Sequence, residues 1–200
     1  GPGRPIDGAA RRCPRHRPHG DRPTPTRWSV ARGVVPVAES SGPADAVLMS
    51  ERALVQLATR QHGLVTTQQA GQLGFDRGAV TSAVAKGRWR RAGIGVLALG
   101  ATPATLHQRT LAAVLSIGEA WASHSTAARV WGWEVRHARV EVIVPGGRKV
   151  ERRNVRVHRS TRLDPEDVAL ADGIPVTSPA RTLIDLSGRI TVDELATCLD

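Results

Sequence analysis

The chain has 200 residues, a formal net charge of +10 and a sequence pI near 11.4. This length allows one large or two small domains with real cores, and the positive charge favours a polyanionic partner, either nucleic acid or an anionic membrane surface. No apolar run approaches the roughly twenty residues of a spanning helix, and no signal peptide is evident, so we expect a soluble cytoplasmic protein.

The charge is unevenly distributed along the chain. Residues 1–48 contain eight Arg and four acids, residues 49–100 seven Arg or Lys and two acids, and residues 101–200 thirteen and twelve. The most cationic segment with a folded pattern is therefore residues 49–100. Cys13 and Cys198 are far apart and belong to no Cys/His cluster, so the sequence predicts neither a disulfide framework nor a zinc site.

Residues 1–48 show no hydrophobic periodicity. Their irregular Pro and Arg residues would interrupt most helices or strands, which predicts a disordered extension. The single methionine, Met49, stands just before a clear helix start. We therefore expect the native protein to start at Met49, and the alternative is a basic arm that contacts phosphates.

Two helices are predicted in the segment that follows. The first runs from Ser50, which can cap it, to Gly63, with an apolar stripe at Leu54, Leu57 and Ala58. Thr66 and Gln69 then fit a capping box, in which each side chain binds the free backbone amide of the other residue. This pattern predicts a short second helix that ends near Leu73.

The run from Asp76 to Lys86 predicts a third helix, with Asp76 as its N-cap and Gly87 just beyond its end. Its inner face carries small apolar residues, namely Ala79, Val80, Ala83 and Val84. Its outer face combines short polar side chains with cations and has no acid; the residues expected to read bases are Arg77, Thr81, Ser82 and Lys86. The three helices fit a helix-turn-helix, and a plain three-helix core with an ordinary surface helix is the alternative.

A hairpin is predicted directly after the third helix. Arg88-Trp89-Arg90-Arg91 leads through a Gly-containing turn to the apolar run Val96–Leu99, which is typical of the wing of a winged helix. We expect Trp89 to pack on the helices, and we expect phosphate contacts from Arg88, Arg90 and Arg91. A solvated basic face is the alternative interpretation.

Residues 101–190 predict a small mixed α+β module. A helix opened by Thr102-Pro103 ends at Gly118, and a second helix runs from about Ser123 to Trp131. Val140–Val144 and Val155–His158 alternate as strands around the basic turn 145–149.

The end of this module follows the same mixed pattern. Asp164, Glu166 and Asp167 predict a turn and a helix cap, and a further short hairpin turns at Asp172-Gly173. Ser178-Pro179 starts a helix in which Arg181 and Asp185 can pair. Residues 191–200 begin another helical-looking region.

The blocks GLVTTQQAGQLGFDRGAVTSAVAKGRWRRAGIGVLAL, ASHSTAARVWGW, VEVIVPGGRK, VRVHRS and DGIPVTSPARTLIDL occur in order. They resemble the AbiEi-type antitoxins of type IV toxin–antitoxin systems, with one departure at Leu97, where relatives often carry Tyr. The resemblance implies a winged-helix DNA-binding antitoxin that represses its own operon and counteracts a nucleotidyltransferase toxin. Many longer relatives carry a C-terminal domain similar to Vsr-type nucleases. This chain stops at Asp200 inside the helical-looking run TVDELATCLD, so we expect it to be truncated.

No catalytic or metal-binding set is predicted. His124 lies between Ser123 and Ser125, but adjacent residues at a helix start rarely face each other, which favours a cap over a nucleophile–base pair. His107, His137 and His158 show no metal-ligand spacing. Glu141, followed by Arg148 and Lys149, lacks the two-residue spacing of restriction-type nucleases. We therefore expect no enzyme activity, no metal and no cofactor in this chain.

The sequence thus predicts an α+β protein with a winged helix-turn-helix at 49–100 and an α+β module at 101–190. The predicted function is sequence-specific binding of double-stranded DNA, as an antitoxin and autorepressor with a nucleotidyltransferase toxin as a second partner and no membrane partner. One alternative is the targeting half of a DNA nuclease, which an Asp…Glu-x-Lys strand pattern beyond Asp200 would favour. The other is a protein-interaction module in which residues 101–190 hold the toxin. The oligomeric state is left open.

Overall fold

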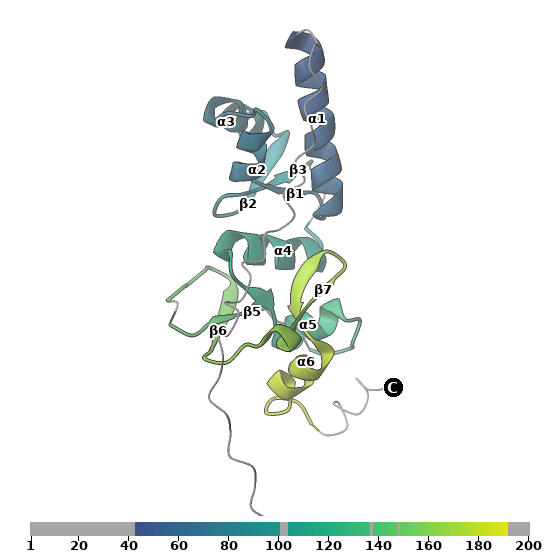
Figure 1. Cartoon of the computed structure of the whole chain (residues 1–200), viewed down its shortest axis with the longest axis vertical. Coiled ribbons are helices and arrows are strands. Elements are labelled where there is room, and N and C mark those ends of the chain that lie inside the picture. The colour runs from purple at the N-terminus through teal and green to yellow at the C-terminus, as the bar shows by residue number, and fades with distance from the viewer. Residues whose placement is uncertain (1–42, 101–103, 137, 148, 192–200) are drawn as a thin grey trace, which may run out of the picture.

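The structure is a computed structural model that describes residues 43–100, 104–136, 138–147 and 149–191 (Figure 1). An N-terminal part with three helices and a small sheet lies above a C-terminal part built on a larger sheet, and α4 (Leu106–Ile117) lies between them. The predicted α+β fold class is confirmed. Of the helices in the described ranges, none combines the length and the apolar character that a membrane crossing needs.

The N-terminal part has the arrangement of a winged helix-turn-helix. Its elements are, in order, α1 (Pro43–Arg60), β1 (Leu64–Thr66), α2 (Thr67–Gln72), α3 (Arg77–Ala85), β2 (Trp89–Gly93) and β3 (Val96–Leu99). The strands form an antiparallel sheet in the order β1-β3-β2. β1, which lies between α1 and α2 in the chain, therefore pairs with β3 and adds a third strand to the β2–β3 hairpin. Helices and sheet share a buried cluster of Leu54, Ala58, Val65, Ala70, Val80 and Leu97.

Two elements of this part differ from the sequence prediction. α1 begins at Pro43, upstream of Ser50, so Ser50 lies inside the helix and does not cap it. Proline is compatible with a first helical turn, and the exposed Val47, Leu48 and Met49 give that end of the helix no inward-facing stripe. The strand β1 was not predicted, because three residues are too few to show an alternating pattern.

The C-terminal part contains a five-stranded mixed sheet in the order β6-β5-β4-β8-β7. Its strands are β4 (Trp121–Ala122), β5 (Val140–Pro145), β6 (Val155–Ser160), β7 (Val168–Ala171) and β8 (Ile174–Thr177). On β5, Val140, Val142 and Val144 pack against α4. Alternation along the strand therefore turns Glu141 towards the other face, where α5 (His124–Val130) and α6 (Pro179–Leu186) lie.

Two predictions for this part need correction. Thr105, whose side chain accepts from Gln108 N at 3.1 Å, caps α4, and Thr102 and Pro103 lie outside the described residues. β5 and β6 pair in parallel, with Val140 opposite Val155, so the basic turn opens a crossover connection. Alternation shows that a segment is a strand, but it carries no information on the direction of its partner.

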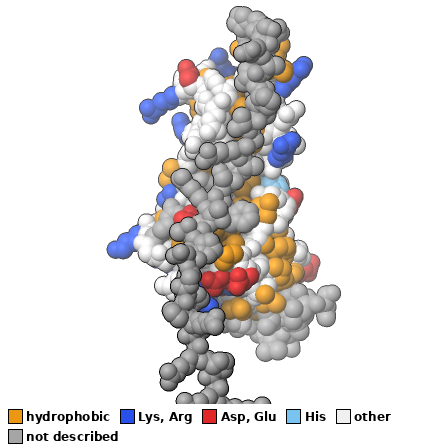
Figure 2. Space-filling view, viewed as in Figure 1, with side chains coloured by type: hydrophobic (Ala, Val, Ile, Leu, Met, Phe, Trp, Pro, Cys, Tyr) orange, Lys and Arg blue, Asp and Glu red, His pale blue; other side chains and the backbone are white. Residues whose placement is uncertain are grey.

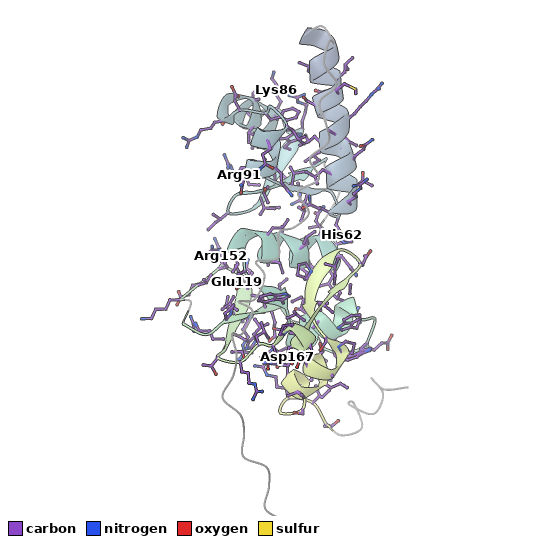
Figure 3. All side chains as sticks on the ribbon, viewed as in Figure 1. His62, Lys86, Arg91, Glu119, Arg152 and Asp167 are labelled. Atoms are coloured by element: carbon purple, nitrogen blue, oxygen red, sulfur yellow. The ribbon has the colours of Figure 1, made fainter. Side chains whose placement is uncertain are left out.

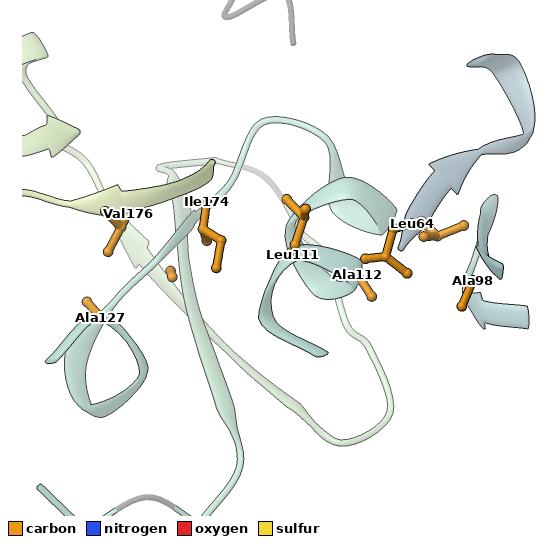
Figure 4. Close-up of a cluster of buried hydrophobic side chains, with 9 residues drawn as sticks. Leu64, Ala98, Leu111, Ala112, Ala127, Ile174 and Val176 are labelled. Carbon is orange, nitrogen blue, oxygen red and sulfur yellow. The ribbon is translucent and has the colours of Figure 1, made fainter. Parts of the chain in front are cut away.

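The two parts share one hydrophobic core (Figure 4). Leu111 and Ala112 of α4 pack against the small sheet on one side and against β4, α5 and β8 on the other; the buried members of this shared core are Leu64, Val96, Ala98, Leu111, Ala112, Ala122, Ala127, Ile174 and Val176. Residue 100 is therefore a boundary in the sequence, whereas the core continues across it through α4.

Candidate nucleic-acid interface

α3 is held by a cap at its start and by its packing along the inner face. Asp76 Oδ1 accepts a hydrogen bond from Ala79 N at 2.7 Å, which satisfies one of the free amides of the first turn. Val80 and Ala83 are buried. The ring of Phe75, just before α3, meets the ring of Trp89 on β2 edge to face, with centroids 5.4 Å apart. These contacts fix the orientation of α3 relative to the hairpin.

The second helix is fixed by the capping box at its start. Thr66 Oγ1 accepts from Gln69 N at 3.1 Å, and Gln69 Oε1 accepts from Thr66 N at 2.8 Å. Ala70 is fully buried beneath this turn. α2 is therefore anchored at its first turn, and it supports α3 through the short Gly74 turn, where φ is +88°.

The outward face of α3 carries exposed polar and cationic side chains. Arg77, Thr81 and Lys86 are exposed, and the Thr81 hydroxyl donates to Arg77 O at 2.8 Å within the helix. Figure 3 shows Lys86 at this helix and Arg91 at β2. The described residues of this face include no acid apart from the capping Asp76. An anionic ligand can therefore approach it without meeting a repelling carboxylate.

Ser82 is placed differently from its predicted partners. It is half-buried and lines a cavity of about 230 Å³ between α1 and α3, together with Glu51, Leu54 and Arg88. Its hydroxyl thus lies on the flank of α3 that faces α1. Among the four residues expected to read bases, the structure brings Arg77, Thr81 and Lys86 to the exposed surface.

The wing separates its three arginines. Arg88 and Arg91 are exposed, whereas Arg90 is half-buried and donates to Gln108 Oε1 on α4. Gln108 in turn donates from Nε2 to His62 O at 2.7 Å. Arg90 therefore ties the wing to α4 and to the end of α1, a role that the one-dimensional pattern did not reveal.

The end of the wing also rests on α4. A Cβ on Gly93 would lie 3.2 Å from Ser116 Cβ and 3.4 Å from Ala112 O, so a larger residue here would push against α4. The pairing of β2 with β3 shifts register between Arg91 and Gly93. The wing therefore packs directly on α4 at Gly93 as well as at Arg90.

Positive charge surrounds this surface. Within residues 49–100, only Glu51 and Asp76 carry negative charge against seven Arg or Lys residues. Figure 2 shows Lys and Arg side chains projecting on both sides of the upper part of the molecule. The shape and the charge of the N-terminal part both suit a polyanion.

A second polar cluster lies in the C-terminal part, at His124, Glu141 and His158. His158 Nε2 lies 2.6 Å from Glu141 Oε2, the rings of His124 and His158 stack with centroids 3.8 Å apart, and the potential ligand atoms of all three lie within 4.8 Å of one another. Ser125 Oγ donates to Glu141 Oε1 at 2.9 Å, and Arg189 donates to Glu141 Oε2 at 2.9 Å.

The electrostatics of this cluster favour a neutral His124 and an ionised Glu141. Burial, followed by the neighbouring His158, lowers the pKa of His124 from 6.5 to about 4. Burial would raise the pKa of Glu141, but hydrogen bonds from His158 and Ser125 outweigh it and lower this pKa to about 2.

The sequence did not predict this cluster. His124 was expected to act as part of a helix cap, but Ser123, the N-cap residue, makes no side-chain capping bond, and His124 is buried with a φ of +51°. His158 was dismissed for lack of spacing, yet the parallel pairing of β5 and β6 places it opposite Ile143, on the same face as Glu141 and within hydrogen-bond distance of that carboxylate. Arg148, which was rejected with Lys149 as a nuclease-type partner of Glu141, lies outside the described residues.

Comparison with known proteins gives matches in both parts of the chain. A family model described as "Transcriptional regulator, AbiEi antitoxin" matches residues 52–100, and one described as "AbiEi antitoxin C-terminal domain" matches residues 112–199. No curated protein matches significantly.

The crystal structure of the RV2827C protein from Mycobacterium tuberculosis is similar with a TM-score of 0.49 and 17% identity, covering 71% of this chain and 61% of that chain. The chain thus spans less than two thirds of that protein. The two family models match in order and together cover more than half of the residues, so the chain belongs to the AbiEi antitoxin family.

Proposed function

We propose that the chain binds duplex DNA sequence-specifically through α3 and represses its own toxin–antitoxin operon. The observation that carries this proposal is the exposed, cationic outer face of α3, held in place by a cap, a buried inner face and the Phe75–Trp89 contact. The family description as a transcriptional regulator supports it. α3 is the second of the two helices of the helix-turn-helix, and this is the helix that lies in the major groove when such a motif reads bases.

We assign different DNA contacts to the residues of α3 according to their position on the helix. Arg77 is exposed at the N-terminal end of the helix, where base contacts are usual, and its fork of donors fits guanine O6 and N7. The Thr81 hydroxyl already donates within the helix, so it offers an acceptor and a methyl group to the groove. We assign Lys86 to the edge of the groove and a minor contribution to Ser82, which lies on the flank towards α1.

The wing supplies phosphate contacts from Arg88 and Arg91, which are exposed. These contacts position the protein and carry no base preference of their own. We assign Arg90 to the support of the wing, because its guanidinium donates to Gln108 on α4. A loss of Arg90 should therefore act through the position of the wing.

We also propose that the chain acts as an antitoxin, and we assign the contact with a nucleotidyltransferase toxin to the C-terminal part. The match of residues 112–199 to the C-terminal domain of AbiEi antitoxins supports this assignment. Co-expression with a nucleotidyltransferase encoded beside the gene should relieve its toxicity. Relief that persists after the C-terminal surface is changed at Leu170 and Ile184, both exposed, would place the contact elsewhere.

The direct test of DNA binding uses the full chain and fluorescence anisotropy. One labelled duplex covers the region upstream of the operon, and a second has the same composition in scrambled order. We expect tighter binding to the upstream duplex, with an affinity that falls as salt rises. Equal affinity for the two duplexes at every salt concentration would reduce the activity to non-specific binding and refute the repressor assignment.

A further inference from the structure

The cluster of His124, Glu141 and His158 has the ligand chemistry of a transition-metal site. It offers two imidazole nitrogens and one carboxylate, a set that suits Zn²⁺ and related ions and does not suit Mg²⁺ or Ca²⁺, which prefer oxygen ligands. The three residues come from the start of α5 and from two neighbouring strands. Rigid elements therefore bring them together.

The distances are close to those that a bound ion requires. The ligand atoms lie within 4.8 Å of one another, whereas two ligands of a tetrahedral zinc ion are about 3.3 Å apart. Small side-chain rotations can close this difference. The rings of His124 and His158 lie together with centroids 3.8 Å apart, and His158 Nε2 lies 2.6 Å from Glu141 Oε2.

The surrounding groups hold the ligands as metal sites generally require. Ser125 donates to Glu141 Oε1 and so orients the carboxylate, whose second oxygen lies beside His158. His124 Nδ1 lies 3.1 Å from Ser123 Oγ and 4.0 Å from the buried Asp185 Oδ2, which has no hydrogen-bond partner. A proton on Nδ1 would face both oxygens and leave the Nε2 lone pair for an ion.

The cluster also has a route of entry. A cavity of about 330 Å³ reaches Glu141, and its lining includes Ser125, Leu186 and Arg189. We infer that His124, Glu141 and His158 form a binding site for a divalent transition-metal ion of the Zn²⁺ class, entered through this cavity. This inference concerns the C-terminal part alone and does not rest on the DNA-binding proposal.

Arg189 makes the inference specific. Its guanidinium occupies Glu141 Oε2, the same oxygen that already lies beside His158, and its side chain is 34% exposed. A metal ion must compete with this cation for the carboxylate. Removal of Arg189 should therefore tighten metal binding, whereas a purely structural ion-pair network gives no reason for any metal to bind.

The test is calorimetric titration of the full chain with ZnCl₂ after treatment with a chelator, together with the visible spectrum of the Co²⁺ form. We expect one equivalent per chain and Co²⁺ bands typical of nitrogen and oxygen ligands. Ser125→Ala removes a group that only orients a ligand and should weaken Zn²⁺ binding by about 10–100-fold. His158→Gln removes a ligand itself and should weaken binding by more than that. Arg189→Ala should strengthen it, and MgCl₂ should give no heat.

His107→Ala is the matched control, because it removes a histidine of another pair, His62 and His107, whose rings are 5.5 Å apart. Its Zn²⁺ affinity should equal that of the parent chain. Circular dichroism establishes that each variant is folded. Absence of saturable Zn²⁺ binding in the parent chain would overturn the inference, and so would equal binding in folded His158→Gln or a loss of binding only in His107→Ala.

Discussion

Leu111 connects the two parts of the molecule, and its truncation should destabilise both together. Its side chain is 2% exposed and packs with Leu64 of the small sheet and with Ile174 of the larger one. A Leu→Ala change in a core costs about 2–5 kcal/mol. The neighbours of Leu111 lie on two separate sheets and cannot easily move into the cavity that the truncation leaves. We therefore expect a cost in the upper part of this range, about 3–5 kcal/mol. For a domain of this size, that loss lowers Tm by roughly 6–20 °C.

Thermal unfolding followed by circular dichroism measures the shift, and hydrogen exchange shows where it acts. We expect one cooperative transition, with equal loss of protection at β1 and at β5. The control is Leu170→Ala, which removes the same atoms from a side chain that is 60% exposed and should change stability by no more than about 0.5 kcal/mol. Protection lost in β5 but retained in β1 would show that the parts unfold separately and would refute the shared core.

Three further predictions concern local structure. Asp76→Ala removes the cap of α3 and should lower the free energy of unfolding by about 0.5–2 kcal/mol, measured by chemical denaturation. Asp76→Ser can still cap the helix and should keep most of the parent stability. Arg181→Ala leaves the buried Asp185 without its 2.9 Å partner and should cost about 3–5 kcal/mol; a double variant with Asp185→Ala that is no more stable than the single one would contradict this explanation. In chelator-treated protein, the free energy of unfolding should fall as pH drops from 6.5 to about 4, because burial and then His158 lower the pKa of His124, so the unfolded chain binds the proton first. His124→Asn should flatten this pH dependence, and an unchanged slope would assign it to other groups.

Local signals in the sequence were sufficient for the elements of the N-terminal part. A capping box needs only two residues at fixed spacing, and the structure contains it at Thr66 and Gln69. The hairpin was visible because an apolar run, Val96–Leu99, follows a turn with Gly93 and Gly95. Such features depend on neighbours within a few residues, which are directly readable from the chain.

Features that depend on distant partners were not predictable in this way. The parallel pairing of β5 with β6, the two-residue β4 and the shared core are set by contacts between segments far apart in sequence. Arg90 looked equivalent to Arg91, and only the alternation along β2, which turns Arg90 towards α4, separates them. The neighbours of His124 are 17 and 34 residues away, so no local spacing could reveal the cluster.

The central claim is that α3 reads bases while the exposed arginines of the wing contact phosphate, and titration of two variants tests it most directly. Arg77→Ala and Arg88→Ala are each titrated against the upstream and scrambled duplexes at several salt concentrations. Arg77→Ala should lose about 1–3 kcal/mol on the upstream duplex and relax the preference at one base position. Arg88→Ala should weaken both duplexes alike and reduce the slope of log K against log[salt] by about 0.9. The account is contradicted if Arg88→Ala changes the base preference while Arg77→Ala changes only the salt slope.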